Sequence, residues 1–218
     1  MATAVSSVAR AQPLRGRISG ASARHVAGNI LVALTFFGAA LPKARHFEYG
    51  PANFIWVTGA IIMGLMSLVR FPPCAAMMNG KAFASTVGAL VLPALVRPAP
   101  PSVGLVASIA IGMEVCGVVL SQVARIYMGR SFGILPGNRG IVTRGPFRIV
   151  RHPIYVGWFL LTIGYFLAYP SWINFLIVSA ASPFMIWRIV LEEQLLLQYP
   201  DYREYAQRVR FWLMPGVF

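Results

Sequence analysis

Acidic residues are scarce in this chain of 218 residues. Six aspartates and glutamates stand against nineteen lysines and arginines, and charged residues make up only 11% of the sequence. Soluble domains carry about a quarter charged residues, so an ordinary soluble domain is excluded. Hydrophobic residues make up 57% of the chain and the mean hydropathy is +0.67. The composition therefore predicts an integral membrane protein.

Cysteine and the common cofactor motifs are also lacking. Cys74 and Cys116 are the only two cysteines, which excludes a disulfide framework, and neither CxxC nor HExxH occurs, so no metal site is predicted. The Gly- and Pro-rich loop from Gly129 to Val150 contains neither GxGxxG nor GxxxxGK[ST]. A nucleotide-containing cofactor would therefore not be held by a Rossmann fold. The net charge of +13 is spread over short stretches between apolar segments, as membrane anchoring requires, and does not indicate nucleic acid binding.

Long apolar runs fill most of the chain. They cover Val26 to Leu41, Ala52 to Val69, Ala82 to Val96, Val103 to Ala124, Ile154 to Tyr169 and Trp172 to Leu191. Crossing the hydrocarbon layer takes about 20 helical residues, with about 17 as a lower limit, so three of the runs are short. The third is the weakest because it contains Pro93, and it could be re-entrant. We expect an all-α membrane bundle of five to six transmembrane helices.

The basic residues predict the orientation of this bundle. If the N-terminus lies inside, the inner segments hold sixteen lysines and arginines, and the outer segments hold only Lys43, Arg45 and Arg97. This bias fits six spans with both termini in the cytoplasm. Residues 1–25 carry four arginines and no acid, which is typical of an organelle transit peptide or of a basic cytoplasmic arm. We expect three regions: this arm, transmembrane helices over residues 26–128, and a functional region over residues 129–218.

The last two apolar runs should bring distant polar residues together. Only Pro170 and Ser171 separate them, so a tight antiparallel hairpin is expected. Its free ends would then place His152 and Tyr155 near a charged cluster about 35 residues further on. That cluster consists of Arg188, Glu192 and Glu193.

Each of these residues also has a plainer interpretation. His152 and Pro153 begin a helix, and Arg151 lies beside this start. Arg151 can therefore bind a carboxylate there, but it can also be an interfacial anchor. Glu192 can pair with Arg188 along the helix, whereas adjacent Glu193 points about 100° away and is left unexplained. Tyr155 can be an interfacial aromatic residue, and Gly157 can be a helix packing position. Glu114, within the fourth run, is either partnered inside the bundle or faces a substrate.

Three motifs in order resemble the isoprenylcysteine carboxyl methyltransferase family. They are RHPIYVG (Arg151 to Gly157), RIVLEE (Arg188 to Glu193) and YPDYREYAQRVRFWLMP (Tyr199 to Pro215), and the lead-in from Gly129 is similar to bacterial members. The resemblance implies S-adenosyl-L-methionine as methyl donor, in a cytoplasmic pocket closed by the C-terminal segment. In that segment Tyr202, Tyr205, Ala206 and Val209 fall on one face at helical spacing, which predicts an amphipathic helix at the membrane surface or over the site, with the tyrosines as packing residues. By motif, His152, Pro153, Tyr155, Gly157, Glu192 and Glu193 would surround this cofactor, and Arg151 and Arg188 match arginines used in catalysis.

These observations lead to three hypotheses. The first is a membrane methyltransferase with its active site on the cytoplasmic side, which esterifies a prenylated cysteine or a similar lipidic acid that enters from the bilayer. The second is a phospholipid methyltransferase that acts on an amine, which would first have to lose a proton to a base. The third is a non-catalytic membrane protein, such as a transporter, that keeps the scaffold. Charges gathered at one interface are not typical of transporters, whose binding sites lie near the bilayer midplane.

Overall fold

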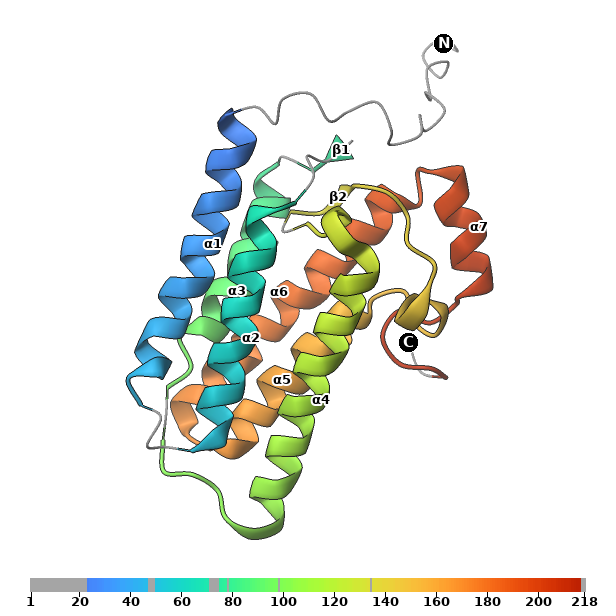
Figure 1. Ribbon diagram of the computed structural model, residues 1–218. Helices are drawn as coiled ribbons and strands as arrows, with labels where there is room; N and C mark the ends of the chain where they lie inside the picture. Colours follow the sequence, from blue (N-terminus) through green and yellow to red (C-terminus); the bar gives the residue numbers. More distant parts are fainter. Residues whose placement is uncertain are drawn as a thin grey trace.

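The protein is a bundle of α-helices (Figure 1). The computed structural model describes residues 23–46, 50–70, 75–77, 79–97, 99–133 and 135–216. In these ranges the elements are α1 (Ala23–Ala44), α2 (Pro51–Leu68), β1 (Ala75–Ala76), α3 (Gly80–Ala94), α4 (Gly104–Met128), η3 (Gly129–Ser131), β2 (Gly137–Asn138), η4 (Gly145–Arg148), α5 (Pro153–Ala168), α6 (Trp172–Leu196) and α7 (Pro200–Arg208). The predicted all-α class is confirmed. Most of the predicted basic arm, residues 1–22, lies outside the described residues, as does Cys74.

All six predicted apolar runs form helices. Among the described residues, four helices are long and apolar enough to cross a membrane: α1 from Val26 onward, α2, α4 and α6. The two others, α3 and α5, are apolar but have only 15 and 16 residues. At about 1.5 Å per residue they fall short of the hydrocarbon thickness. Pro93, the reason for doubting the third run, lies in the last turn of α3, where the helix is ending anyway.

The closest helix pair is α4 with α5, because small residues face each other there. A Cβ added to Gly157 would lie 2.1 Å from Ser121 Oγ, and one added to Gly117 would lie 2.7 Å from the Gly157 carbonyl oxygen. Further along, Gly164 gives room to the buried side chain of Glu114. Both Glu114 carboxylate oxygens are buried, and neither has a hydrogen-bond partner among the described residues. Small residues thus let two backbones approach closely, as in other membrane helix pairs.

The predicted hairpin of α5 and α6 is looser than expected. The two helices are joined through Pro170 and Ser171, and the Ser171 hydroxyl caps α6 by accepting a hydrogen bond from the backbone N–H of Asn174 at 3.1 Å. However, α5 packs mainly on α4, and α6 packs mainly on α3. The short connection therefore holds the end of α5 close to the start of α6. The start of α5 and the end of α6 are joined by side-chain contacts.

One end of the bundle carries most of the irregular structure (Figure 1, top). There β1 pairs antiparallel with β2, with Ala75 opposite Asn138 and Ala76 opposite Gly137. The 3₁₀ turn η4 and α7 lie at the same end, beside the start of α5 and the end of α6. Phe147, Tyr202 and Tyr205 form a buried cluster that attaches α7 to the bundle. The predicted amphipathic helix is confirmed, since these tyrosines lie on its buried face.

Candidate active site

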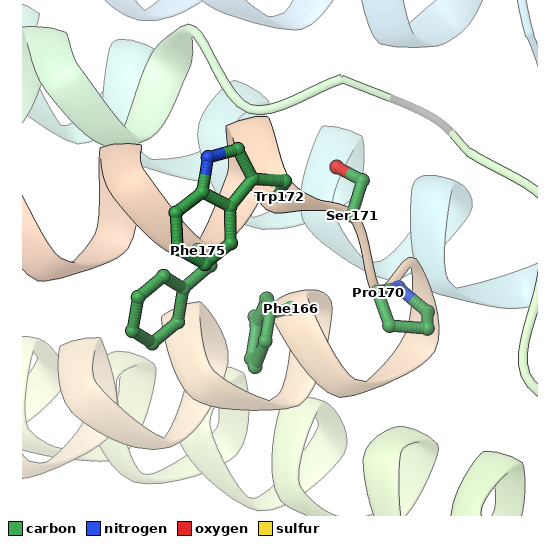
Figure 2. Close-up of a pocket in the computed structure, with 5 residues that line it drawn as sticks. All are labelled: Phe166, Pro170, Ser171, Trp172 and Phe175. Atoms are coloured by element: carbon green, nitrogen blue, oxygen red, sulfur yellow. The ribbon is translucent and has the colours of Figure 1, made fainter.

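A large cavity lies inside the bundle. Its volume is about 750 Å³, within the usual range for ligand sites, and each helix from α1 to α6 contributes to its walls. Apolar side chains such as Val32, Met63 and Leu90 form most of the lining. A smaller hollow of about 350 Å³ occurs at the turn between α5 and α6, lined by Phe166, Pro170, Ser171, Trp172 and Phe175 (Figure 2). That hollow has no titratable side chain, so the larger cavity is the candidate site.

The C-terminal segment holds the start of α5. The backbone N–H groups of Arg151 and His152 donate to the carbonyl oxygens of Phe211 and Trp212, each at 2.9 Å. The Trp212 ring also lies 5.5 Å from the Arg151 guanidinium carbon and contacts the His152 ring edge-on. These two N–H groups are therefore already bonded within the chain. A ligand at this helix start would contact side chains and not these two amides.

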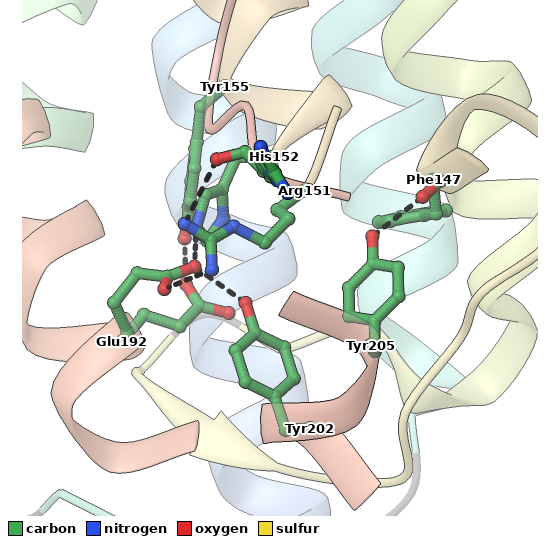
Figure 3. Close-up of polar contacts among 9 residues, drawn as sticks. Phe147, Arg151, His152, Tyr155, Glu192, Tyr202 and Tyr205 are labelled. Atoms are coloured by element: carbon green, nitrogen blue, oxygen red, sulfur yellow. Dashed lines mark hydrogen bonds and ion pairs between the residues drawn. The ribbon is translucent and has the colours of Figure 1, made fainter. Parts of the chain in front are cut away.

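Glu193 is the centre of the polar cluster, whose members Arg151, His152 and Tyr202 are labelled in Figure 3. Its Oε1 accepts hydrogen bonds from Tyr202 OH at 2.6 Å and contacts His152 Nε2 at 2.8 Å, and its Oε2 lies 3.1 Å from Arg151 Nη1. The Glu193 side chain is only 2% exposed. A buried carboxylate is stable only when its charge is matched, and Arg151 supplies that charge. Glu193 thus joins α6, α7 and the start of α5.

Glu192 takes part in a second polar chain. Tyr155 donates from its hydroxyl to Glu192 Oε2, and the same hydroxyl accepts a hydrogen bond from Arg188 Nε at 3.1 Å. Arg188 also donates from Nη1 to Thr86 Oγ1 on α3, at 2.6 Å. The phenol of Tyr155 therefore stands between the guanidinium and the carboxylate. The alternative of a direct Arg188 to Glu192 pair along α6 is not what the structure has.

Two tyrosines of α7 complete the wall. Tyr205 donates from its hydroxyl to the carbonyl oxygen of Phe147 at 2.7 Å, and Tyr202 donates to Glu193 as described above. Burial, reinforced by the Glu193 carboxylate, raises the pKa of Tyr202 far above its usual range. Burial likewise raises the pKa of Tyr205. Both phenols therefore stay protonated and act as donors at neutral pH.

The structure brings most of the predicted site residues together. Those that line the cavity are Arg151, His152, Pro153, Tyr155, Arg188 and Glu192. Glu193 lies directly behind them, in contact with Arg151 and His152. Gly157 does not line the cavity, because it faces α4 at the contact with Ser121. This position matches the packing alternative for Gly157, and its predicted part in cofactor binding stays a prediction.

Sequence reasoning missed three members of the cluster. Thr86 lies in the run that looked weakest as a span, and only its contact with Arg188 reveals a role. Tyr202 was interpreted as a packing residue, although its hydroxyl donates to Glu193. Trp212 contacts both Arg151 and His152. The sequence signal for Tyr202 was a polar atom on an otherwise buried helix face, whereas Thr86 gave no signal.

Comparisons with known proteins agree with this picture. Residues 105–200 match the family model of phospholipid methyltransferases. Over 162 residues, or 69% of this chain, the sequence is 26% identical to a protein-S-isoprenylcysteine O-methyltransferase of Schizosaccharomyces pombe, and it covers 63% of that relative. Over 118 residues, or 48% of this chain, it is 35% identical to protein-S-isoprenylcysteine O-methyltransferase B of Arabidopsis thaliana, and it covers 57% of that relative. The chain thus spans about three fifths of the curated relatives it matches.

The matched region contains the start of α5 and the end of α6, which hold the polar cluster. The apolar helices and the matched family together make the chain an integral membrane protein. The resemblance that the three motifs indicated is confirmed: this is a protein similar to the membrane methyltransferases of the isoprenylcysteine and phospholipid type.

Proposed function

We propose that this protein is a membrane methyltransferase that uses S-adenosyl-L-methionine to methylate the carboxylate of a prenylated cysteine or a similar lipidic acid. The observation that carries the proposal is the polar cluster of Arg151, His152, Tyr155, Arg188 and Glu192 at one end of an apolar cavity. A lipid chain fits apolar walls, and a charged donor and acceptor fit the polar end. The similarity to isoprenylcysteine methyltransferases supports this choice of acceptor.

The polar residues fit the chemistry of the donor. S-Adenosyl-L-methionine supplies, when bound, an electrophilic methyl group on a sulfonium. Its amine and ribose hydroxyls need acceptors, for which the cavity-lining Glu192 offers a carboxylate. Its own carboxylate needs a cationic donor, for which Arg151 offers a guanidinium beside the His152 ring. Glu193 would not contact the donor itself, but would hold Arg151 and His152 in position. Pro153 and Tyr155 would form the adjoining wall.

Arg188 is suited to hold the acceptor. Its Nε and Nη1 are directed by Tyr155 and Thr86, so the planar guanidinium is fixed at the cavity wall. A carboxylate acceptor is already ionised at neutral pH. It therefore needs to be oriented but does not need a general base. With the donor bound, the acceptor oxygen held by Arg188 would form the new bond to the methyl carbon as the carbon–sulfur bond breaks, which would give an ester and a neutral thioether. Positioning can supply most of the acceleration in such an in-line displacement.

The acceptor would enter the cavity from the side. The lining residues Leu31 of α1 and Phe83 of α3 are 67% and 65% exposed on the outer apolar surface. Since α1 packs on α2 and α3 packs on α6, the cavity reaches the surface between α1 and α3. A lipid tail could pass here without crossing water. The charged cluster would face the cytoplasm, where the basic segments of the chain favour one side of the membrane.

The test is methyl transfer by purified protein in proteoliposomes. With labelled S-adenosyl-L-methionine, we expect base-labile label in N-acetyl-S-farnesylcysteine and none in phosphatidylethanolamine. Glu192→Gln should lower activity by at least about tenfold, because the carboxylate makes a charge-assisted contact. The matched control is Glu204→Gln, since Glu204 is 74% exposed and pairs only weakly with Arg208 at 3.7 Å. Label in neither lipid, with no binding of S-adenosylhomocysteine, would refute the proposal.

Amine methylation of a phospholipid is the second candidate. It is supported by the match of residues 105–200 to the phospholipid methyltransferase model. A protonated amine must lose its proton before it attacks. The Glu192 carboxylate lines the cavity and accepts a hydrogen bond from Tyr155, so it is the base that would take this proton. Stable label in phosphatidylethanolamine, and none in the farnesylcysteine, would favour this reaction. Its rate should fall already as the pH drops from alkaline to neutral, where the amine becomes protonated, whereas esterification should fall only below about pH 4, where the carboxylate acceptor protonates.

A further inference from the structure

The apolar part of the cavity extends away from the polar cluster, along the bundle. Its lining residues on α3 run from Phe83 to Ala94, and those on α5 run from Pro153 to Thr162. The polar cluster lies where α5 begins, whereas Ala94 is the last residue of α3. The start of α5 and the end of α3 lie at opposite sides of the bundle (Figure 1). The cavity therefore has a far end, at the end of α3.

Trp56 forms the floor at this far end. It lines the cavity, and it packs against a cluster of buried residues that are not part of the cavity lining. These residues are Ala52, Val96, Ala110, Tyr165, Ala168 and Tyr169. The Trp56 side chain therefore separates the cavity from a packed core. A ligand cannot extend further in this direction unless it displaces the indole ring.

Lys43 holds the Trp56 ring in place. Its Nζ lies 4.2 Å from the centre of the Trp56 ring and donates a hydrogen bond at 3.0 Å to the carbonyl oxygen of Ala94. The lysine is only 1% exposed. A desolvated ammonium group is attracted strongly to the face of a tryptophan ring. Because Lys43 belongs to α1 and Ala94 to α3, a single cation joins α1, α2 and α3 around the floor.

Tyr165 and Asn53 continue this network. The Tyr165 ring lies 5.6 Å from Lys43 Nζ, and its hydroxyl donates to Asn53 Oδ1 at 2.7 Å. Asn53 in turn donates from Nδ2 to the carbonyl oxygen of His46 at 2.7 Å. Tyr165 and Asn53 are fully buried. Buried polar groups that satisfy one another make a rigid structure, so the floor has a fixed position.

The lateral opening of the cavity ends before the floor. The lining residues Leu31 of α1 and Phe83 and Val91 of α3 are 67%, 65% and 40% exposed, so the opening extends along α3 as far as Val91. Beyond it, the lining residue Pro93 is buried and Lys43 bridges α1 to α3. A lipid tail that enters from the side and points away from the polar cluster would therefore end in a closed pocket.

We propose that Trp56 limits the tail length of the lipidic acceptor and contacts the last isoprene unit of a tail that fits. This role rests on the proposed function, and it adds which tails the site accepts. Trp56 is thus a specificity-determining residue, and Lys43 is the residue that positions it. Neither residue belongs to the motifs that resemble the methyltransferase family.

The length of the wall between the polar cluster and the floor selects the tail. Thr86, which holds Arg188, and Ala94 lie on the same helix, and at about 1.5 Å per residue the wall between them is about 12 Å long. An extended chain advances about 3.5 Å for every three bonds, so geranyl, farnesyl and geranylgeranyl tails reach about 9, 14 and 19 Å. A slightly bent farnesyl tail thus reaches the floor, a geranyl tail does not, and a geranylgeranyl tail is too long.

Methyl transfer to three acceptors that differ only in the tail tests this floor. With the N-acetylcysteine thioethers of geranyl, farnesyl and geranylgeranyl in proteoliposomes, we expect kcat/KM to be highest for the farnesyl compound. Trp56→Ala should raise the ratio of kcat/KM for geranylgeranyl to that for farnesyl by at least about tenfold, since a single methylene changes the fit to an apolar pocket by about 10- to 200-fold. Lys43→Met, which keeps the length of the side chain and removes its charge, should shift the ratio in the same direction.

Trp172→Ala is the matched control. Trp172 is 71% exposed and does not line the cavity, so its loss should leave the ratio between the two tails unchanged. The proposal on tail length is overturned if the unmodified protein uses the farnesyl and geranylgeranyl compounds equally well, or if Trp56→Ala keeps the ratio of the unmodified protein.

Two readouts do not require methyl transfer, so they separate this proposal from the proposed function. In native mass spectrometry of the unmodified protein, the farnesyl compound should bind more tightly than the geranylgeranyl compound, and Trp56→Ala should remove that preference. A farnesyl compound with a diazirine at the far end of its tail should label Trp56 or Ala94 in the unmodified protein. Label on Leu31 or Phe83 instead would place the end of the tail in the lateral opening and overturn the proposal. If no acceptor is methylated, the enzymatic proposal fails, while the binding preference and the labelled residues still decide whether Trp56 is the floor.

Discussion

At the scale of single residues, Glu193 is the side chain on which the site depends most. It is almost fully buried and contacts Tyr202, His152 and Arg151. Glu193→Gln removes its charge and leaves the Arg151 guanidinium without a carboxylate in a buried place. Breaking a buried ion pair costs about 3–5 kcal/mol, so we expect a clear loss of thermal stability and of S-adenosylhomocysteine affinity. Calorimetry checks both.

The matched control for that substitution is Glu204→Gln. Glu204 pairs with Arg208 at 3.7 Å, and both side chains are exposed. Exposed pairs contribute about 0–1 kcal/mol, so the melting temperature should hardly change. An equal effect of the two substitutions would mean that Glu193 has no special place in the site.

Thr86 is a positioning residue for Arg188. It accepts a hydrogen bond from Arg188 Nη1 at 2.6 Å, and it lies on a different helix. Thr86→Val removes the acceptor and keeps the shape, and a hydrogen bond to a charged group is worth about 1.5–3 kcal/mol. We therefore expect kcat for methyl transfer to fall by at least about tenfold while S-adenosylhomocysteine affinity is kept.

Rescue separates positioning from packing at this residue. Thr86→Ser restores the hydroxyl and should recover most of the rate. Thr58→Val is the matched control, because the Thr58 hydroxyl donates to the Phe54 carbonyl oxygen of its own helix and Thr58 is only half-buried. If Thr86→Ser is as slow as Thr86→Val, the role of Thr86 is not to hold Arg188.

Which single residues could be predicted depended on how local their contacts are. Arg151, His152, Glu192 and Glu193 stand out in the sequence because charges are rare and expensive in an apolar chain. Thr86 could not be found, since 102 positions separate it from Arg188 and one threonine in an apolar run carries no pattern. Likewise, the sequence could not tell that Arg188 reaches Glu192 through the Tyr155 hydroxyl and not directly.

At the scale of elements, the α4–α5 contact orients the site. Gly157 faces Ser121 and Gly117 across this contact, and a Cβ at position 157 would lie 2.1 Å from Ser121 Oγ and 2.5 Å from the Gly117 carbonyl oxygen. Gly157→Ala must therefore push α5 away from α4. Overpacking of this kind costs about 1–3 kcal/mol, and we expect a lower melting temperature in detergent.

A glycine elsewhere on α4 provides the comparison. A Cβ added to Gly112 would meet nothing within 4 Å, so Gly112→Ala should leave the melting temperature unchanged or raise it slightly. If both substitutions are neutral, the close approach at Gly157 is not essential. A loss of cofactor binding without any loss of stability in Gly157→Ala would instead favour the role that the family resemblance implies.

Apolar periodicity and length predicted the existence of the helices well, whereas their packing partners were not predictable. The two-residue connection of α5 and α6 indicated a tight pair, yet α5 packs on α4 and α6 packs on α3. Glycines decide this, because the small residues that permit the closest approach lie on the α4–α5 contact. A side chain's partner helix depends on the packing of all the bundle's helices at once, and a local pattern contains no such information.

At the scale of the whole molecule, the charge distribution predicts how the protein sits in the membrane. The start of α5 and the end of α6, which hold the polar cluster, lie at the same end of the bundle as α7 (Figure 1). Lys43 is in the last turn of α1 and Arg97 follows the end of α3, and these two helices end at the opposite side of the bundle. Basic residues are retained on the cytoplasmic side. The cluster and the C-terminal helix should therefore both face the cytoplasm.

Cysteine accessibility tests this orientation directly. In a chain with Cys74→Ala and Cys116→Ala, Gln207→Cys on α7 should react with a membrane-impermeant maleimide in inverted vesicles and not in intact cells. Pro101→Cys, in the loop between α3 and α4, should react in the opposite way; both positions are exposed. Because the donor is a soluble metabolite with a fixed charge, it cannot diffuse through the bilayer to a site on the far side. Labelling of Gln207→Cys from outside intact cells would therefore contradict the orientation and deprive the proposed methyltransferase of its donor.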